Sequence, residues 1–250
     1  MLRAAIWLAS LVAATATAAG PTSAPTTPAA PRLRVMLDAG HGGSNTGAPG
    51  VVAGVYEKRV TLAVTRALAA DLRAAGIDVV MTRHDDRYLT LRERVRRANA
   101  AGVDVFVSVH ANASPAHAQR GYETYVLAPA ALTTDARALR HDDGPPRPGV
   151  PEAARVVLDE LEREAAQEGA LRLAQRVQAR LSEVRGPEGN RGVRHGSMDV
   201  LMGPVMPAVL VEVGFVDHPV EGVELLRSDV RAGIATALSR AILEWGRARP

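Results

Sequence analysis

The chain has no cysteine, very few aromatic residues and a single lysine. Cysteine is absent from all 250 residues, and aromatic residues make up 3% of them. Without disulfides, the fold must be stabilised by its core and by any bound metal. Because 47% of the residues are apolar, the chain can still bury a sizeable core, made mainly of alanine, valine and leucine. This composition is typical of buried parallel strands covered by alanine-rich helices.

The sequence also lacks the dense basic run with interleaved aromatics that is typical of nucleic-acid-binding proteins. The isoelectric point is near 9.8, although the formal net charge is only +3. With Lys58 as the sole lysine and no cysteine, almost nothing titrates between neutrality and about pH 10. The basic segment RERVRR at 92–97 alternates with the apolar positions of a helix. We therefore expect no nucleic-acid partner.

Residues 1–18 have the pattern of a secretory signal peptide. Arg3 precedes the apolar segment AAIWLASLVAA, and the small residues ATA follow at 16–18. The apolar segment is shorter than the ~20 residues of a membrane span, although an uncleaved anchor is the alternative. We expect cleavage near Ala18, a periplasmic or secreted location, and no membrane span in the mature chain. Residues 19–33 are rich in proline, threonine and alanine and are predicted to be a flexible linker.

From residue 34 onward, strand-like and helix-like segments alternate. The expected strands are 34–38, 77–82, 103–109, 121–127 and 208–213. The expected helices are 57–75, 89–102, 151–185 and 221–247. Segment 121–127 is expected at a sheet edge, and 133–168 is expected to be a helical insertion. The order predicts a single α/β domain over 34–250, with a mixed, mostly parallel sheet flanked by helices.

Three strand-like segments carry a residue that can bind or serve a metal near their ends. RVMLDAGH ends at His41, VDVFVSVH ends at His110, and AVLVEVG carries Glu212. The carboxyl ends of parallel strands converge, so these side chains can meet in one crevice. Glu57 opens the helix that follows the glycine-rich loop. The loop fits neither G-x-G-x-x-G nor a P-loop, and its glycines are expected to let the backbone fold tightly around His41.

Each of these residues has a structural alternative. Glu57 could be a first-turn carboxylate favoured by the helix dipole, and His110 could be a core histidine. Glu212 interrupts an apolar run, where an unpaired carboxylate needs a metal, a partner or a catalytic role. Two imidazoles and a carboxylate would form a three-ligand zinc site with one open position, as in hydrolytic zinc enzymes. Glu212 then fits the role of proton shuttle.

Several motifs occur in the order found in one enzyme family. LDAGHGG, the pair EK at 57–58, the pair TR at 82–83, SVHAN and MPAVLVEVGF span residues 34–247 of this chain. Together they resemble the zinc-dependent N-acetylmuramoyl-L-alanine amidases of the AmiA/AmiB/AmiC type. Ala39 and the pair DH at 217–218 depart from the usual family residues, and neither position is a proposed ligand.

The resemblance implies that His41, Glu57 and His110 bind Zn²⁺ and that Glu212 is the catalytic glutamate. It further implies hydrolysis of the amide between the lactyl group of N-acetylmuramic acid and the L-alanine of the stem peptide. Peptidoglycan would be the substrate, in cell-wall remodelling or daughter-cell separation.

Residues 133–168 resemble the insertion of division-type amidases, whose helix can cover the zinc until an activator moves it. We therefore expect a regulatory insertion and a protein activator, although a solvated acidic helix face is the alternative. Arg83 and Asn112 are further candidates for orienting substrate. Two other functions remain open: a zinc peptidase or carboxypeptidase acting on wall peptides, and a non-catalytic wall-binding regulator.

Overall fold

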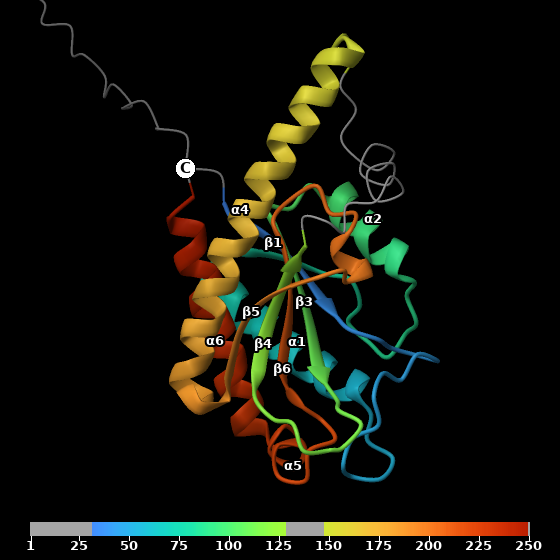
Figure 1. Cartoon of the computed structure of the whole chain (residues 1–250), viewed down its shortest axis with the longest axis vertical. Helices are drawn as coiled ribbons and strands as arrows, with labels where there is room; N and C mark the ends of the chain where they lie inside the picture. The colour runs from blue at the N-terminus through green and yellow to red at the C-terminus, as the bar shows by residue number, and fades with distance from the viewer. Residues whose placement is uncertain (1–31, 129–147, 250) are drawn as a thin grey trace, which may run out of the picture. The chain divides into compact units, whose positions relative to one another are not determined.

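The computed structural model describes residues 32–128 and 148–249 (Figure 1). The predicted signal peptide, most of the predicted linker and residues 133–147 of the predicted insertion lie outside the described residues. Leu33, at the end of the predicted linker, is buried in the core, so the fold begins slightly earlier than predicted. None of the described helices is long and apolar enough to cross a membrane.

Six strands and several helices make up the described chain. The strands are β1 (Arg34–Ala39), β2 (Asp78–Met81), β3 (Val105–Asn112), β4 (Tyr122–Leu127), β5 (Asn190–Gly196) and β6 (Ala208–Phe215). The helices are α1 (Glu57–Ala74), α2 (Leu91–Ala101), α4 (Glu152–Arg185), α5 (Glu221–Glu224) and α6 (Ser228–Arg247). Two short 3₁₀ turns, η2 (Pro187–Gly189) and η3 (Asp199–Leu201), flank β5.

The strands form one sheet in the order β2-β1-β3-β6-β4-β5. Every neighbouring pair is parallel except β4 and β6, which run antiparallel. The prediction of a mixed, mostly parallel α/β sheet is therefore confirmed. The prediction that 121–127 is an edge strand is wrong, because β5 adds to the outer side of β4. β5 was not predicted: it has the sequence NRGVRHG, and with Val193 as its only apolar residue it lacks an alternating apolar pattern.

The predicted final helix, 221–247, is divided in two. α5 ends at Glu224, and Arg227 has extended backbone angles before α6 begins at Ser228. α5 packs against the end of β6, whereas α6 packs against α1 and α4. One straight helix could not make the contacts of α5 with β6 and those of α6 with α1 and α4 at the same time, because they lie on different parts of the domain.

The sheet has an apolar core on each face. One face is covered by α1, α4 and α6, which pack on the valines of β1, β3 and β6. The other face is covered by α2 and η3, around residues such as Met36, Phe106 and Leu210. In Figure 1, α2 lies on the opposite side of the sheet from α4 and α6. The helices of the second face leave the carboxyl ends of β3 and β6 uncovered, and the candidate site lies there.

A buried ion pair anchors the loop that follows β1. Arg94 of α2 donates to Asp38 at 2.7 Å and to the backbone carbonyl of His41 at 2.6 Å. The hydroxyls of Thr82 and Ser108 also donate to Asp38, at 2.5 and 2.7 Å. Burial alone would raise the pKa of Asp38, but Arg94 and the two hydroxyls outweigh it and hold that pKa below its ordinary value. Arg94 is therefore a structural residue rather than part of a basic surface.

Asp38→Asn should destabilise the fold strongly, because it leaves the Arg94 guanidinium buried without its counterion. We expect a loss of about 3–5 kcal/mol in the free energy of unfolding, measured with urea. Since the folded pKa of Asp38 lies below its unfolded value, its contribution is present above about pH 4 and disappears as the pH falls through the folded pKa. The difference between wild type and variant should shrink accordingly in acid.

The control is Asp229→Asn, which removes the exposed partner of Arg227. It should change the free energy of unfolding by less than about 0.5 kcal/mol. An Asp38→Asn variant that is as stable as this control would contradict the anchoring role.

Candidate metal centre

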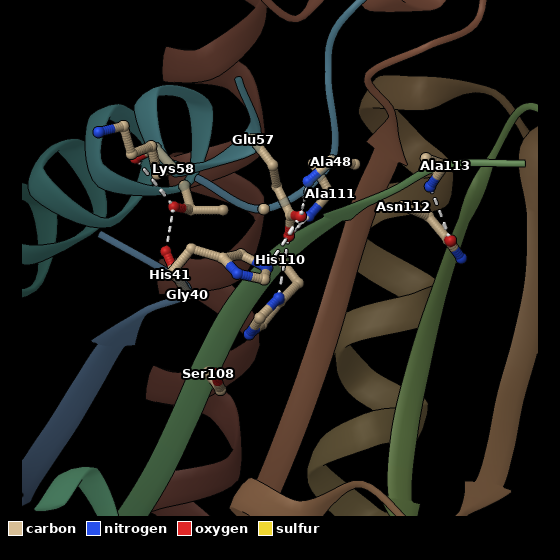
Figure 2. Close-up of polar contacts among 12 residues, drawn as sticks. Gly40, His41, Ala48, Glu57, Lys58, Ser108, His110, Ala111, Asn112 and Ala113 are labelled. Carbon is tan, nitrogen blue, oxygen red and sulfur yellow. Dashed lines mark hydrogen bonds and ion pairs between the residues drawn. The ribbon is translucent and has the colours of Figure 1, made fainter. Parts of the chain in front are cut away.

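His41, Glu57 and His110 come from three segments that meet at the carboxyl ends of the parallel strands. His41 lies in the loop after β1, Glu57 is the first residue of α1, and His110 lies within β3. Figure 2 shows the three side chains pointing toward one another. One potential ligand atom from each lies within 4.8 Å of the other two, so the group could hold a metal ion. The predicted meeting of these distant residues is therefore found in the structure.

The Glu57 carboxylate is the centre of this group. Its two oxygens lie 2.9 Å from His41 Nε2 and 2.9 Å from His110 Nδ1. The backbone amides of Ala48 and Ala111 each donate to one of these oxygens at 3.1 Å. Burial alone would raise the pKa of Glu57, but the hydrogen bonds from His110 and His41 outweigh it and hold that pKa far below its ordinary value. The carboxylate is therefore ionised and fixed in orientation.

The surroundings of His41 favour the protonated form of its imidazole. Burial lowers the pKa of His41, but the hydrogen bond and the charge of Glu57 raise it more, so the net shift is upward. The other ring nitrogen, Nδ1, lies 2.9 Å from Asn45 Oδ1. A hydrogen bond there directs Nε2 toward Glu57, as outer-shell partners of metal-binding histidines commonly do. His41 and Glu57 would hold a metal ion together with His110.

Two glycines allow the backbone to approach the group closely. A Cβ atom on Gly40 would lie 2.4 Å from the His110 ring. Gly47 has a φ of 67°, and a Cβ atom there would lie 2.5 Å from a Glu57 oxygen. The prediction that glycines let the loop fold tightly around His41 is confirmed at Gly47, where a Cβ atom would also lie 2.7 Å from the His41 ring, whereas Gly40 makes room for His110.

Glu212 lies beside this group on the same face of the sheet. It is in register with His110 of β3 and, on its other side, with Glu123 of β4. Its Oε2 atom is buried and has no hydrogen-bond partner within the described parts of the chain. Burial, followed by the negative charges of Glu57 and Glu123, raises the pKa of Glu212 well above its ordinary value. Its surroundings therefore favour the protonated form of the carboxyl group.

Sequence reasoning missed Glu123, a second buried carboxylate of the same face. It accepts hydrogen bonds from Asn112 at 2.9 Å, Tyr125 at 3.1 Å and Arg191 at 3.1 Å, and Arg194 lies 3.4 Å away. The sequence did carry a signal, since a glutamate interrupts the apolar strand YETYVL as Glu212 interrupts AVLVEV. The partners could not be foreseen, because two of them lie on the unpredicted strand β5.

The two residues predicted to orient substrate lie in different environments. Arg83 is fully buried and donates to the backbone carbonyls of Ala39, Gly40 and Asp85. It therefore supports the loop from within, and the prediction of substrate contact is wrong for this residue. Asn112 lines the cavity beside the metal group, although its amide is hydrogen-bonded to a carboxylate.

A cavity of about 360 Å³ opens on the group and is lined by His41, Glu57, His110 and Glu212. All four residues predicted for the site therefore face one space. Its wall is partly apolar, with Leu210 and Met198 among the lining residues. A cavity of this size accommodates a small part of a substrate rather than a whole polymer.

The acidic residues of α4 do not join this group. Glu160 pairs with Arg163, and Glu168 pairs with Arg172. Among the residues that the structure describes, only the two histidines and Glu57 form the candidate metal group. The predicted covering role of this helix is not seen in this conformation and stays a prediction.

Comparison with known proteins identifies relatives of the whole domain. Residues 35–244 match the Amidase_3 family, described as N-acetylmuramoyl-L-alanine amidase. The Neisseria meningitidis amidase AmiC is 33% identical over 220 residues, which cover 83% of this chain and 52% of that protein. The Salmonella typhimurium amidase AmiA is 31% identical over 219 residues, which cover 84% of this chain and 75% of that protein. The chain thus spans about half the length of one relative and three quarters of the other.

Solved structures agree with these sequence relatives. The N-acetylmuramoyl-L-alanine amidase of Clostridium difficile 630 is 26% identical, with a TM-score of 0.69, and the match covers 88% of this chain and 99% of that one. The amidase AmiC2 of Nostoc punctiforme is 27% identical, with a TM-score of 0.65, and the match covers 86% and 97%.

Fold and site together define an α/β enzyme with a candidate metal centre at the carboxyl ends of its strands. The chain belongs to the Amidase_3 family. It is accordingly an enzyme of the N-acetylmuramoyl-L-alanine amidase class.

His41→Ala and His110→Ala should each lose most of the bound metal, because either change removes one of three potential ligands. The measurement is elemental analysis of purified protein after dialysis. His84→Ala is the matched control, because this histidine is exposed and is not a member of the group. It should retain about one metal ion per chain. Stoichiometric metal in either test variant would contradict the assignment.

Proposed function

We propose that the chain is an exported zinc hydrolase of peptidoglycan. It cleaves the amide between the lactyl group of N-acetylmuramic acid and the L-alanine of the stem peptide. The observation that carries this proposal is that Glu212 presents an unpartnered carboxyl oxygen beside the cluster of His41, Glu57 and His110. Two imidazoles and one carboxylate are the ligand set of hydrolytic zinc, which supports zinc as the metal.

His41, Glu57 and His110 would hold the ion in this proposal. When bound, zinc would acidify water and polarise the carbonyl of the scissile amide. The backbone amides of Ala48 and Ala111 donate to Glu57, and His41 Nδ1 is hydrogen-bonded to Asn45 Oδ1. These bonds keep both side chains in position before any ion binds. Such prior orientation lowers the reorganisation that binding requires.

Glu212 would move the proton of the reaction. It would take a proton from the attacking water and deliver it to the nitrogen of the leaving L-alanine. Burial and the neighbouring carboxylates raise the pKa of Glu212, which favours the protonated form that donates to the leaving nitrogen. Its position next to His110 across the β3–β6 pairing places the carboxyl group at the same cavity.

Export and a role in wall remodelling or daughter-cell separation complete the proposal. The predicted signal peptide at 1–18 and the predicted linker that follows support export into the periplasm or medium. The named relatives are amidases of N-acetylmuramoyl-L-alanine, a linkage found in the cell wall. An enzyme with this substrate must reach the wall to act.

A protein activator acting on the start of α4 is also proposed. This part of the helix carries exposed apolar side chains: Val156, Val157, Leu158 and Leu161. Figure 1 shows the yellow amino-terminal half of α4 extending beyond the sheet. A cluster of exposed apolar residues is typical of a surface that binds another protein or another part of the chain. We propose that this surface covers the site in one state and binds an activator in another.

Wild-type enzyme loaded with zinc should release stem peptides with N-terminal L-alanine from purified peptidoglycan. Glu212→Gln should keep its zinc and its fold while turnover falls by at least ~100-fold, the usual effect of losing a general base. Mass spectrometry of the soluble products measures both results.

Elemental analysis of Glu212→Gln is the control for metal content. Products cut within the peptide, with alanine still attached to the sugar, would instead indicate a zinc peptidase. Near-normal turnover by the zinc-loaded variant would contradict the role of Glu212. An absence of any product from both the zinc-loaded wild type and the zinc-loaded variant that lacks residues 152–162 would favour the non-catalytic alternative.

Removing residues 152–162 should raise basal hydrolysis in the absence of any activator, because it deletes the proposed cover. The deletion ends before Ala166, which is the first residue of α4 that is buried in the core. Dye release from labelled peptidoglycan provides the rate. Zinc content and thermal unfolding serve as controls for the site and the fold. A folded, zinc-loaded deletion variant with unchanged activity would show that this part of α4 is not a cover.

A further inference from the structure

Two arginines of β5 lie beside Glu123, next to the proposed catalytic site. Arg191 Nε lies 3.1 Å and Arg194 Nε lies 3.4 Å from the same oxygen of Glu123. One carboxylate balances only one guanidinium, so one positive charge is left over. This charge lies at the open edge of the sheet, because β5 is the outermost strand.

The two arginines differ in how they are held. Arg191 also donates to Gln119 at 3.1 Å and lies over the Phe215 ring at 5.1 Å. Arg194 has no hydrogen bond to any described residue beyond its 3.4 Å ion pair with Glu123, and half of its side chain is exposed. Its planar guanidinium therefore keeps free N–H donors, the arrangement that recognises a carboxylate through two parallel hydrogen bonds.

Arg194 faces the same side of the sheet as the catalytic group. Val193, its neighbour in β5, packs against the core beneath α4, so alternation along the strand directs Arg194 to the opposite face. Glu123 and Glu212 are directly paired across β4 and β6 on that face. Arg194 pairs with Tyr125, which lies opposite Leu210 of β6, so Arg194 is two strand spacings across the sheet and two residues along it from Glu212, or roughly 12 Å between backbones. Its long side chain shortens that gap, since it reaches back to Glu123.

The proposed substrate has a carboxylate at a matching distance. L-alanine provides the nitrogen of the scissile amide, and the second residue of the stem peptide is a glutamate linked onward through its side-chain carboxyl. Its main-chain carboxylate is therefore free. Two residues of extended chain span about 7 Å, which brings that carboxylate from the scissile bond to the region of Arg194.

We propose that Arg194 is a specificity-determining residue that binds the free main-chain carboxylate of this glutamate. The inference rests on the proposed function, because the proposed function determines which amide of the substrate is cleaved at the site. Arg194 contacts the substrate two residues from the cleaved bond, and Glu123 holds its guanidinium in place through Nε. In some peptidoglycans this carboxylate is replaced by a carboxamide, so the contact would separate two natural forms of the substrate.

The test compares two soluble glycan substrates that differ only at this group, one with glutamate and one with isoglutamine at the second position. Zinc-loaded wild type should prefer the carboxylate form by about tenfold in kcat/KM, mostly through KM, as expected for one charge-assisted contact at a half-exposed site. Arg194→Gln should lose this preference, because kcat/KM should fall more for the carboxylate form than for the carboxamide form. Arg194→Lys should keep part of the preference, because it retains the charge without the planar fork.

Arg240→Gln is the matched control, because Arg240 is an exposed arginine of α6 paired with Glu183. It should retain the full preference. Equal cleavage of both substrates by wild type, or an equal loss on both in Arg194→Gln, would overturn the inference and leave the proposed function standing. If neither zinc-loaded wild type nor the zinc-loaded variant that lacks residues 152–162 cleaves either substrate, the proposed function fails and this inference fails with it.

Discussion

The Glu57 carboxylate holds together the three segments on which the site depends. It bonds to His41 in the loop after β1, to His110 in β3 and to the backbone amides of Ala48 and Ala111. Because these partners saturate both oxygens, the loop, the start of α1 and the end of β3 cannot move independently. Gly40 and Gly47 are required by the same contacts, since a side chain at either position would collide with the group. The glycine-rich loop is thus explained by packing around a carboxylate rather than by phosphate binding.

Three carboxylates follow one another across the uncovered face, and their surroundings separate their roles. Glu57 has two imidazoles and two amides, and Glu123 has two arginines, a tyrosine and an asparagine. Glu212 lies between them with a buried oxygen that none of the described residues bonds. The negative charges of the two outer carboxylates disfavour a charge on the middle one and raise its pKa. The fold therefore creates one proton-holding group beside a cation-binding group.

Much of this arrangement could be predicted because it is encoded in local sequence. The apolar strands that contain His110 and Glu212 are continuous and buried, and parallel strands place their carboxyl ends together. α2 could also be predicted, because Thr90 caps its amino terminus: the Thr90 hydroxyl accepts a hydrogen bond from the backbone N–H of Glu93 at 3.1 Å. In each case the pattern of a single segment was sufficient.

The parts that escaped prediction depend on pairing between distant segments. β5 is stabilised by its parallel neighbour β4 rather than by an apolar pattern of its own, and Gly192 with a φ of 84° interrupts it. The antiparallel pairing of β4 with β6, which sets Glu123 opposite Glu212, is not visible in either strand alone. Arg83 resembled a substrate residue, yet its guanidinium is buried among loop carbonyls.

The central claim is that His41, Glu57 and His110 form one zinc site at the carboxyl ends of the strands. Diffraction data collected from crystals of the zinc-loaded protein on both sides of the zinc absorption edge test it most directly. We predict a single strong anomalous peak within about 2.0–2.2 Å of His41 Nε2, His110 Nδ1 and a Glu57 oxygen. A zinc peak elsewhere, or one that lacks any of these three ligands, would contradict the account.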